Sequence, residues 1–117
     1  MLKNLRTHQL AVQFYKITRS KRLPNGLGKQ LGRAASSVAL NLAEGYGRKT
    51  APDRIRFFQI ALGSIRECEA ILGLEAQSFT AGEKALLNHL AAATYLLIRH
   101  HPNPGLLPKP SRAELPR

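Results

Sequence analysis

Three short breaks divide the first hundred residues of this chain into four segments with helical periodicity. In each segment, apolar side chains recur at steps of three and four residues, the spacing that places them on one side of an α-helix. The segments cover about residues 4–21, 27–46, 50–77 and 80–100. Because each break is only a few residues long, neighbouring helices must run antiparallel. The sequence therefore predicts an all-α fold, an antiparallel up-down-up-down four-helix bundle over residues 1–101.

The residues at each break explain why the helices should end and begin there. Proline cannot continue a helix and Asn-Gly favours a turn, so residues 24–26 should end the first helix. We expect Gly45 and Gly47 to loosen the backbone and end the second helix. Residues 50–53 carry a Thr cap, an early Pro and an Asp, which favour the start of the third helix. Residues 80–83 read Thr-Ala-Gly-Glu, a capping box that opens the fourth.

The segment over residues 30–48 carries two stripes at helical spacing instead of one. Its apolar face consists of Leu31, Ala34 or Ala35, Val38 and Leu42. A polar stripe beside this face consists of Gln30, Arg33, Ser37, Asn41, Glu44 and Arg48. Amide, guanidinium, hydroxyl and carboxylate groups in a line next to the core favour defined contacts with another helix or subunit. A solvated flank of the helix and a direct ligand contact are the alternatives.

Specific ion pairs are expected from the polar stripe. Glu44 and Arg48 are i,i+4 partners in the favourable order. Arg33 is positioned to reach Glu67 or Glu69 on an adjacent helix. Such pairs contribute little at a surface but can fix the register of two helices when they are desolvated.

Two stretches of the sequence resemble the motifs of a known family. Residues 30–48 read Gln-Leu-Gly-Arg-Ala-Ala-Ser-Ser-Val-Ala-Leu-Asn-Leu-Ala-Glu-Gly-Tyr-Gly-Arg. Residues 56–69 read Arg-Phe-Phe-Gln-Ile-Ala-Leu-Gly-Ser-Ile-Arg-Glu-Cys-Glu. Both are similar to segments of the four-helix-bundle proteins that intervening sequences of bacterial large-subunit ribosomal RNA genes encode. The resemblance spans about residues 8–100, and that family is also similar to the accessory variability determinants of diversity-generating retroelements.

The resemblance implies properties that the residues alone do not. It implies a four-helix bundle that assembles into homopentamers and has no established catalytic activity. For the retroelement relatives it implies binding to nucleic acid and to a reverse transcriptase.

The third and fourth helices are apolar over more than one face, which indicates self-association. A monomeric bundle needs one apolar stripe per helix, so the surplus predicts contacts between subunits. Leu90 and Ile98 are the residues whose replacement with Glu should yield smaller species. Gly63 and Ser64 would allow another helix to approach closely. The alternative is a wide core stripe within one subunit.

The charge of the chain indicates a polyanionic partner. The sequence has 18 Lys and Arg against 7 Asp and Glu, a formal net charge of +11. Both ends of the bundle should be basic, and phosphate backbones suit repeated, widely spaced cations. The candidate contacts are Lys16, Arg19, Lys21, Arg22, Lys29, Arg48, Lys49 and Arg54. We expect RNA ahead of DNA, with weak base stacking because only Tyr15 and Tyr46 lie near these residues; a solubilising surface is the alternative.

Catalytic and metal-binding patterns are missing from the sequence. Bundle metal sites use a Glu-x-x-His pair, and the chain has none. His100 and His101 are adjacent, so on a helix their rings would point about 100° apart. Glu67 and Glu69 would sit on different faces of one helix and make a poor acid–base pair. We therefore expect no enzyme, no metal and no cofactor; a small ribonuclease is the disfavoured catalytic alternative.

The remaining features concern location and the C-terminus. The chain has no apolar run of about 18 residues, no signal-peptide pattern and a single cysteine, Cys68, which together predict a cytoplasmic protein without membrane contact. Five of the seven prolines fall within residues 102–117, which predicts a flexible, disordered tail. With the double-faced helices, such a tail also suits a second function, a protein-interaction adaptor such as an accessory subunit of a reverse transcriptase.

Overall fold

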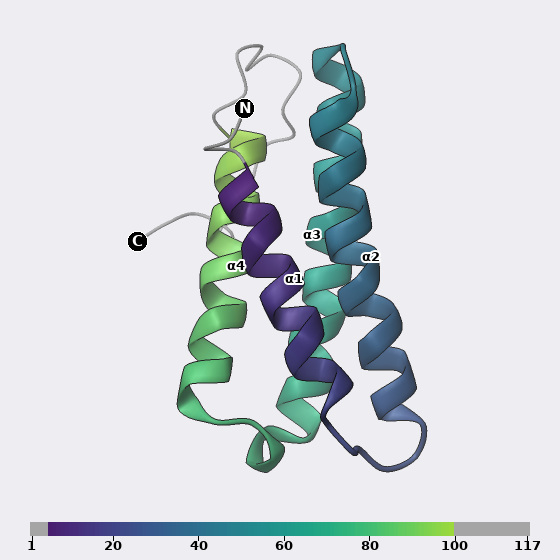
Figure 1. Ribbon diagram of the computed structural model, residues 1–117, viewed down its shortest axis with the longest axis vertical. Coiled ribbons are helices and arrows are strands. Elements are labelled where there is room, and N and C mark those ends of the chain that lie inside the picture. The colour runs from purple at the N-terminus through teal and green to yellow at the C-terminus, as the bar shows by residue number, and fades with distance from the viewer. Residues whose placement is uncertain (1–4, 100–117) are drawn as a thin grey trace.

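The structure is a computed structural model that describes residues 5–99 as four α-helices with short connections (Figure 1). The helices are α1 (Leu5–Arg19), α2 (Leu27–Gly47), α3 (Ala51–Leu74) and α4 (Ala81–Arg99), and a 3-10 turn, η2 (Ala76–Ser78), precedes α4. Residues 5–99 contain no strand, and the all-α prediction is confirmed. The predicted tail over residues 102–117 lies outside the described residues.

Each helix packs against two others, so the four helices form a closed bundle. α2 contacts α1 and α3, and α4 contacts α3 and α1. Successive helices run in opposite directions, which confirms the up-down-up-down topology (Figure 1). We call the end with residues 20–26 and 75–80 the loop end, and the end with the α2–α3 connection, residues 48–50, the turn end.

The capping residues lie where the sequence places them. The Thr50 side chain accepts a hydrogen bond from the Asp53 N–H at 3.4 Å. The Thr80 hydroxyl accepts from the Glu83 N–H at 3.1 Å, and Glu83 accepts from the Thr80 N–H at 2.9 Å, which completes the capping box. Asn25 and Gly26 have φ values of 58° and 76°, the left-handed conformations that an Asn-Gly turn favours.

Two helices end earlier than predicted. α1 stops at Arg19 because the N–H groups of Ser20 and Lys21 bond to carbonyls three residues back, which tightens the last turn. α3 stops at Leu74, and its continuation toward residue 77 is replaced by η2. Both differences fall at helix ends, where local hydrogen bonds compete with the regular ladder.

Most of the apolar surface of α3 and of α4 belongs to one core. Each of these helices packs against two neighbours and therefore buries a wide face. Leu90 is 0% exposed and Ile98 is 6% exposed. Their assignment to a subunit interface is therefore wrong: they are core residues of the single chain. The largest fully buried side chains are Phe14, Leu31, Leu42, Ile65, Leu90 and Val38.

A smaller apolar surplus remains on the outside of the bundle. The exposed large side chains and their exposed fractions are Leu40 68%, Ile60 44%, Leu74 67% and Leu96 45%. Leu40 lies on α2 and Ile60 on α3. These residues, and not Leu90 or Ile98, are the ones that a partner could cover.

Gly45 lies inside α2 and permits a close approach between α2 and α3. A Cβ at this position would lie 2.5 Å from Cε1 and 2.8 Å from Cδ1 of Phe58. The Phe58 ring also packs edge-on against Tyr46, with ring centroids 5.4 Å apart. The helix ends at Gly47, close to its predicted end, but Gly45 itself is required by packing and not by backbone conformation.

We expect Gly45→Ala to lower the free energy of unfolding by about 1–3 kcal/mol, the usual cost of overpacking a core. The Phe58 side chain is buried, so its ring cannot withdraw without disturbing its neighbours. Gly63→Ala is the matched control, since nothing lies within 4 Å of a Cβ there and the site is exposed. The control should gain up to about 1 kcal/mol from helix propensity. Denaturant unfolding that shows equal effects for both variants would contradict the close approach.

Candidate nucleic-acid interface

Four of the candidate cations gather at the loop end of the bundle, together with Arg33 of the polar stripe. Lys16 and Arg19 occupy the last turn of α1. Lys29 and Arg33 lie one turn apart at the start of α2, and Arg22 lies in the connection between the two helices. All five side chains are exposed. We refer to Lys16, Arg19, Arg22, Lys29 and Arg33 as the loop-end cations.

Within the described part of the chain, the loop-end cations have no acidic partners. Among residues 5–99, none of their side chains forms a salt bridge or a hydrogen bond. The first acidic residue of the chain is Glu44, which lies near the turn end. Lys16 with Arg19 and Lys29 with Arg33 are like-charge pairs one turn apart, each of which costs about 0.2–0.5 kcal/mol. Repulsion between these cations therefore destabilises the fold slightly, and no acidic side chain among the described residues offsets it.

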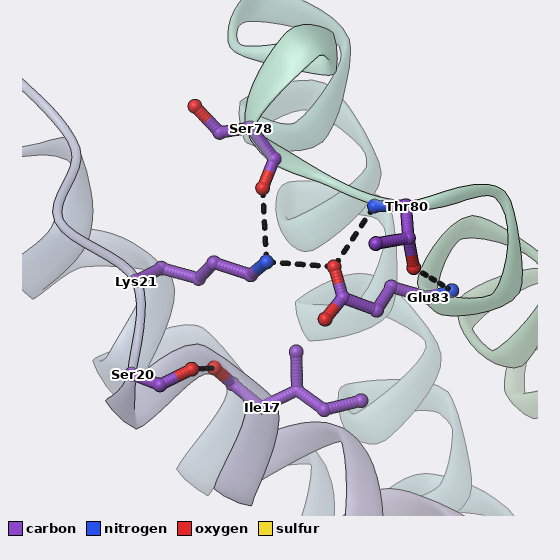
Figure 2. Close-up of polar contacts among 6 residues, drawn as sticks. All are labelled: Ile17, Ser20, Lys21, Ser78, Thr80 and Glu83. Atoms are coloured by element: carbon purple, nitrogen blue, oxygen red, sulfur yellow. Dashed lines mark hydrogen bonds and ion pairs between the residues drawn. The ribbon is translucent and has the colours of Figure 1, made fainter.

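Lys21 differs from these five residues because its side chain turns into the protein (Figure 2). Its Nζ donates hydrogen bonds to Glu83 Oε1 at 2.6 Å and to the Ser78 carbonyl at 2.9 Å. The ammonium also lies 4.9 Å from the centroid of the Phe79 ring. Only 15% of the Lys21 side chain is exposed. Lys21 thus links the α1–α2 connection to the start of α4, and its ammonium group is engaged within the protein instead of facing a phosphate.

We expect Lys21→Met to lower the free energy of unfolding by about 1–3 kcal/mol, the usual value of hydrogen bonds to a charged group. The methionine keeps an aliphatic stem over Phe79 but removes both hydrogen bonds. Thermal unfolding at neutral pH measures the effect. A melting temperature equal to that of the unmodified protein would show that the contact contributes nothing.

The same contact predicts how stability depends on pH. The hydrogen bond from Lys21, together with that from the Thr80 N–H, holds the pKa of Glu83 below its ordinary value. A carboxyl group with a lowered folded pKa stabilises the protein above its unfolded pKa, and this contribution is lost as pH falls through the folded value. When the pH is lowered below about 4, the free energy of unfolding should therefore decrease less for Lys21→Met than for the unmodified protein. Parallel acid-unfolding curves for the two proteins would contradict this expectation.

The cations at the turn end are partly neutralised by the protein itself. Arg48 donates to Glu44 Oε2 at 2.7 Å, and Arg54 Nε donates to the Arg48 carbonyl at 2.7 Å. The guanidinium groups of Arg48 and Arg56 lie 4.7 Å and 4.4 Å from the centroid of the Phe57 ring. Lys49 is exposed. Arg48 and Arg54 are therefore already engaged in contacts within the protein. The sequence did not predict the cluster of arginines around Phe57.

The polar stripe of α2 divides into a half-buried part and an exposed part. The Ser37 and Ser64 hydroxyls lie 2.8 Å apart across α2 and α3, and Asn41 Nδ2 donates to the Ser37 carbonyl at 2.9 Å. The Ser37–Ser64 contact joins the two helices and fixes their register, whereas the Asn41 bond lies within α2. Gln30 and Arg33 are exposed.

Of the two ion pairs expected from the polar stripe, one is not formed within residues 5–99 and the other lies exposed at the surface. Arg33 forms no salt bridge with Glu67 or Glu69 among the described residues, and Glu69 instead accepts a hydrogen bond from Arg66 at 2.9 Å. The Glu44–Arg48 pair forms, but its side chains are 55% and 42% exposed. A pair this exposed contributes at most about 0.5 kcal/mol.

A shallow groove between α1 and α4 is separate from the basic residues. Its volume is about 480 Å³, and it is lined by Gln13, Ile17, Thr80, Gly82, Glu83, Ala85, Leu86 and His89. No Lys or Arg is among the lining residues. The groove therefore has no Lys or Arg side chain to hold a phosphate.

The described residues include neither a cluster of metal ligands nor an ionised thiol. No group of three His, Cys, Asp or Glu within the described range could hold a metal ion. Burial raises the pKa of Cys68 to about 12, so its thiol stays protonated at neutral pH. None of the described helices is both long and apolar enough to cross a membrane.

Comparison with known proteins identifies a family from the sequence. The family described as 23S rRNA-intervening sequence protein matches residues 5–96, which include all of α1, α2 and α3 and most of α4. Comparison with curated proteins and with solved structures gave no match. The family match covers most of the chain and agrees with the motifs over residues 30–48 and 56–69. The chain therefore belongs to the 23S rRNA-intervening sequence protein family.

Proposed function

We propose that this protein is a non-catalytic, oligomeric RNA-binding protein whose loop-end cations contact phosphates. The observation that carries the proposal is the set of five exposed cations without an acidic partner among the described residues. A fold that keeps mutually repelling charges close together is best suited to a ligand that neutralises them. Phosphate backbones supply such charges at regular spacing.

RNA is the partner that we favour over DNA. The family takes its name from an intervening sequence of 23S rRNA, which links its members to an RNA-coding context. The turn-end residues Arg48, Lys49 and Arg54 form a second, weaker basic surface, because Arg48 is paired with Glu44 and Arg54 donates to the Arg48 carbonyl.

Self-association is the second part of the proposal. The Ser37–Ser64 contact fixes the register of α2 and α3, and Leu40 and Ile60 each lie one turn from it toward the turn end. They therefore form a small exposed apolar surface that a second copy would cover. The homopentamer that the family resemblance implies would repeat the loop-end cations around a ring, and bound RNA would offset their repulsion.

Binding can be tested directly with the purified full-length protein. Filter binding at about 50 mM salt should show sub-micromolar retention of RNA. Crosslinking in cells, followed by recovery of the bound RNA, would identify the ligand. Retention of neither RNA nor duplex DNA would mean that the basic surface serves solubility alone.

A protein-interaction adaptor is the second candidate function. It is favoured by the exposure of Leu40 and Ile60, which would contact a different protein instead of a second copy. The resemblance to accessory proteins of retroelements suggests a reverse transcriptase as that protein. A protein that is monomeric and retains no RNA, yet forms a complex with a purified reverse transcriptase, would favour the adaptor.

A further inference from the structure

We infer that the loop-end cations bind double-stranded RNA in preference to single-stranded RNA, through phosphates and without reading the bases. The inference rests on the proposed function and names the class of RNA that this surface fits. It follows from the arrangement of the cations and from the lack of an exposed aromatic ring beside them among residues 5–99.

The cations lie on two rigid rows joined by a basic connection. Lys16 and Arg19 form a row on α1, and Lys29 and Arg33 form a row on α2. Side chains one turn apart have Cβ atoms about 5–6 Å apart, and packed helix axes lie about 8–10 Å apart. A duplex presents two rows of phosphates on either side of a groove, which suits two rows of cations held at a fixed separation.

The loop end has no exposed aromatic ring among the described residues. Phe14 is fully buried, Phe79 is buried beneath the Lys21 ammonium, and Tyr15 is half-buried and packs against the core. Proteins that hold single strands combine a basic groove with aromatic side chains on which bases stack. The bases of a single strand would therefore find no aromatic ring to stack on here, whereas those of a duplex are already stacked and paired with one another.

The turn end provides the internal comparison. Phe57 is half-buried between the guanidinium groups of Arg48 and Arg56, an aromatic and cationic combination of the kind that stacks bases. A single strand would therefore bind at the turn end if it bound at all. The two ends can be separated by mutation because their residues do not overlap.

The test compares a blunt RNA duplex of about 16 base pairs with one of its strands, chosen so that it cannot pair with itself. Fluorescence anisotropy at about 50 mM salt should show the duplex bound about tenfold more tightly, since each phosphate contact on a duplex releases more counterions. The variant Arg19→Gln/Arg22→Gln/Lys29→Gln should lose duplex binding, and Phe57→Leu should retain it.

Other outcomes separate the inference from the proposed function. Equal or tighter binding of the single strand, or loss of duplex binding in Phe57→Leu with an unchanged melt, would overturn the inference while RNA binding stands. If neither the duplex nor the single strand binds, both the inference and the proposed function are overturned. Different affinities for duplexes of unrelated sequence would overturn the claim that bases are not read.

Discussion

Replacing Arg19, Arg22 and Lys29 together with Gln is expected to weaken binding of duplex RNA about a thousandfold at 50 mM salt. All three side chains are exposed and unpaired within the described part of the chain, so each is free to contact a phosphate. With the slope of about −0.9 per phosphate measured for duplex DNA, each contact is worth about tenfold at this salt concentration relative to 1 M. The melting temperature should not fall, because the substitutions relieve repulsion and break no contact.

A matched variant separates local contacts from total charge. Arg6, Arg56 and Arg99 are exposed and lie toward the turn end, so their joint replacement with Gln removes the same net charge from the opposite end. We expect this control to weaken duplex binding less than tenfold. Equal losses for the two triple variants would show that net charge, and not the loop-end surface, controls binding.

The second large effect concerns the core. Leu90→Glu is expected to lower the free energy of unfolding by more than about 4 kcal/mol. Because this free energy is only about 5–15 kcal/mol for a stable domain, the variant should not fold at ordinary temperature. Leu90 is 0% exposed, so the carboxyl group would have to be buried without a partner or protonated. Circular dichroism should show loss of helix. A folded, monomeric Leu90→Glu protein would instead place Leu90 at an interface.

Leu40→Glu is the companion to this variant. Leu40 is 68% exposed, so the substitution should leave the melting of the single chain almost unchanged. If the surface formed by Leu40 and Ile60 joins copies of the chain, Leu40→Glu should shift sedimentation toward the monomer. A folded variant with unchanged sedimentation would exclude Leu40 from the interface.

The helices could be predicted from sequence because their signals are local. Residues 24–26, Thr50 and the Thr80–Glu83 capping box act through neighbouring backbone groups, and the structure confirms all three. Gly45 was misinterpreted because a glycine near the end of a helix resembles a helix breaker. Its actual role depends on Phe58, which approaches only after α2 and α3 have packed together.

The interface and the candidate site were harder to predict for the same reason. Periodicity shows that α4 is apolar on more than one face, but it cannot tell a helix with two neighbours in its own chain from one with a neighbour in another copy. Leu90 and Ile98 were therefore assigned to the wrong surface. Likewise, Lys21 was grouped with the other cations by its charge, although its partner Glu83 lies 62 residues away in sequence.

The salt dependence of duplex RNA binding tests the central claim most directly. Affinities of the unmodified protein and of Arg19→Gln/Arg22→Gln/Lys29→Gln should be measured by anisotropy between about 50 and 200 mM salt. If the loop-end cations hold phosphates, the plot of log affinity against log salt should be steep for the unmodified protein and shallower by about 2.7 for the variant. Equal slopes for the two proteins, or a slope near zero for the unmodified protein, would contradict phosphate binding by this surface.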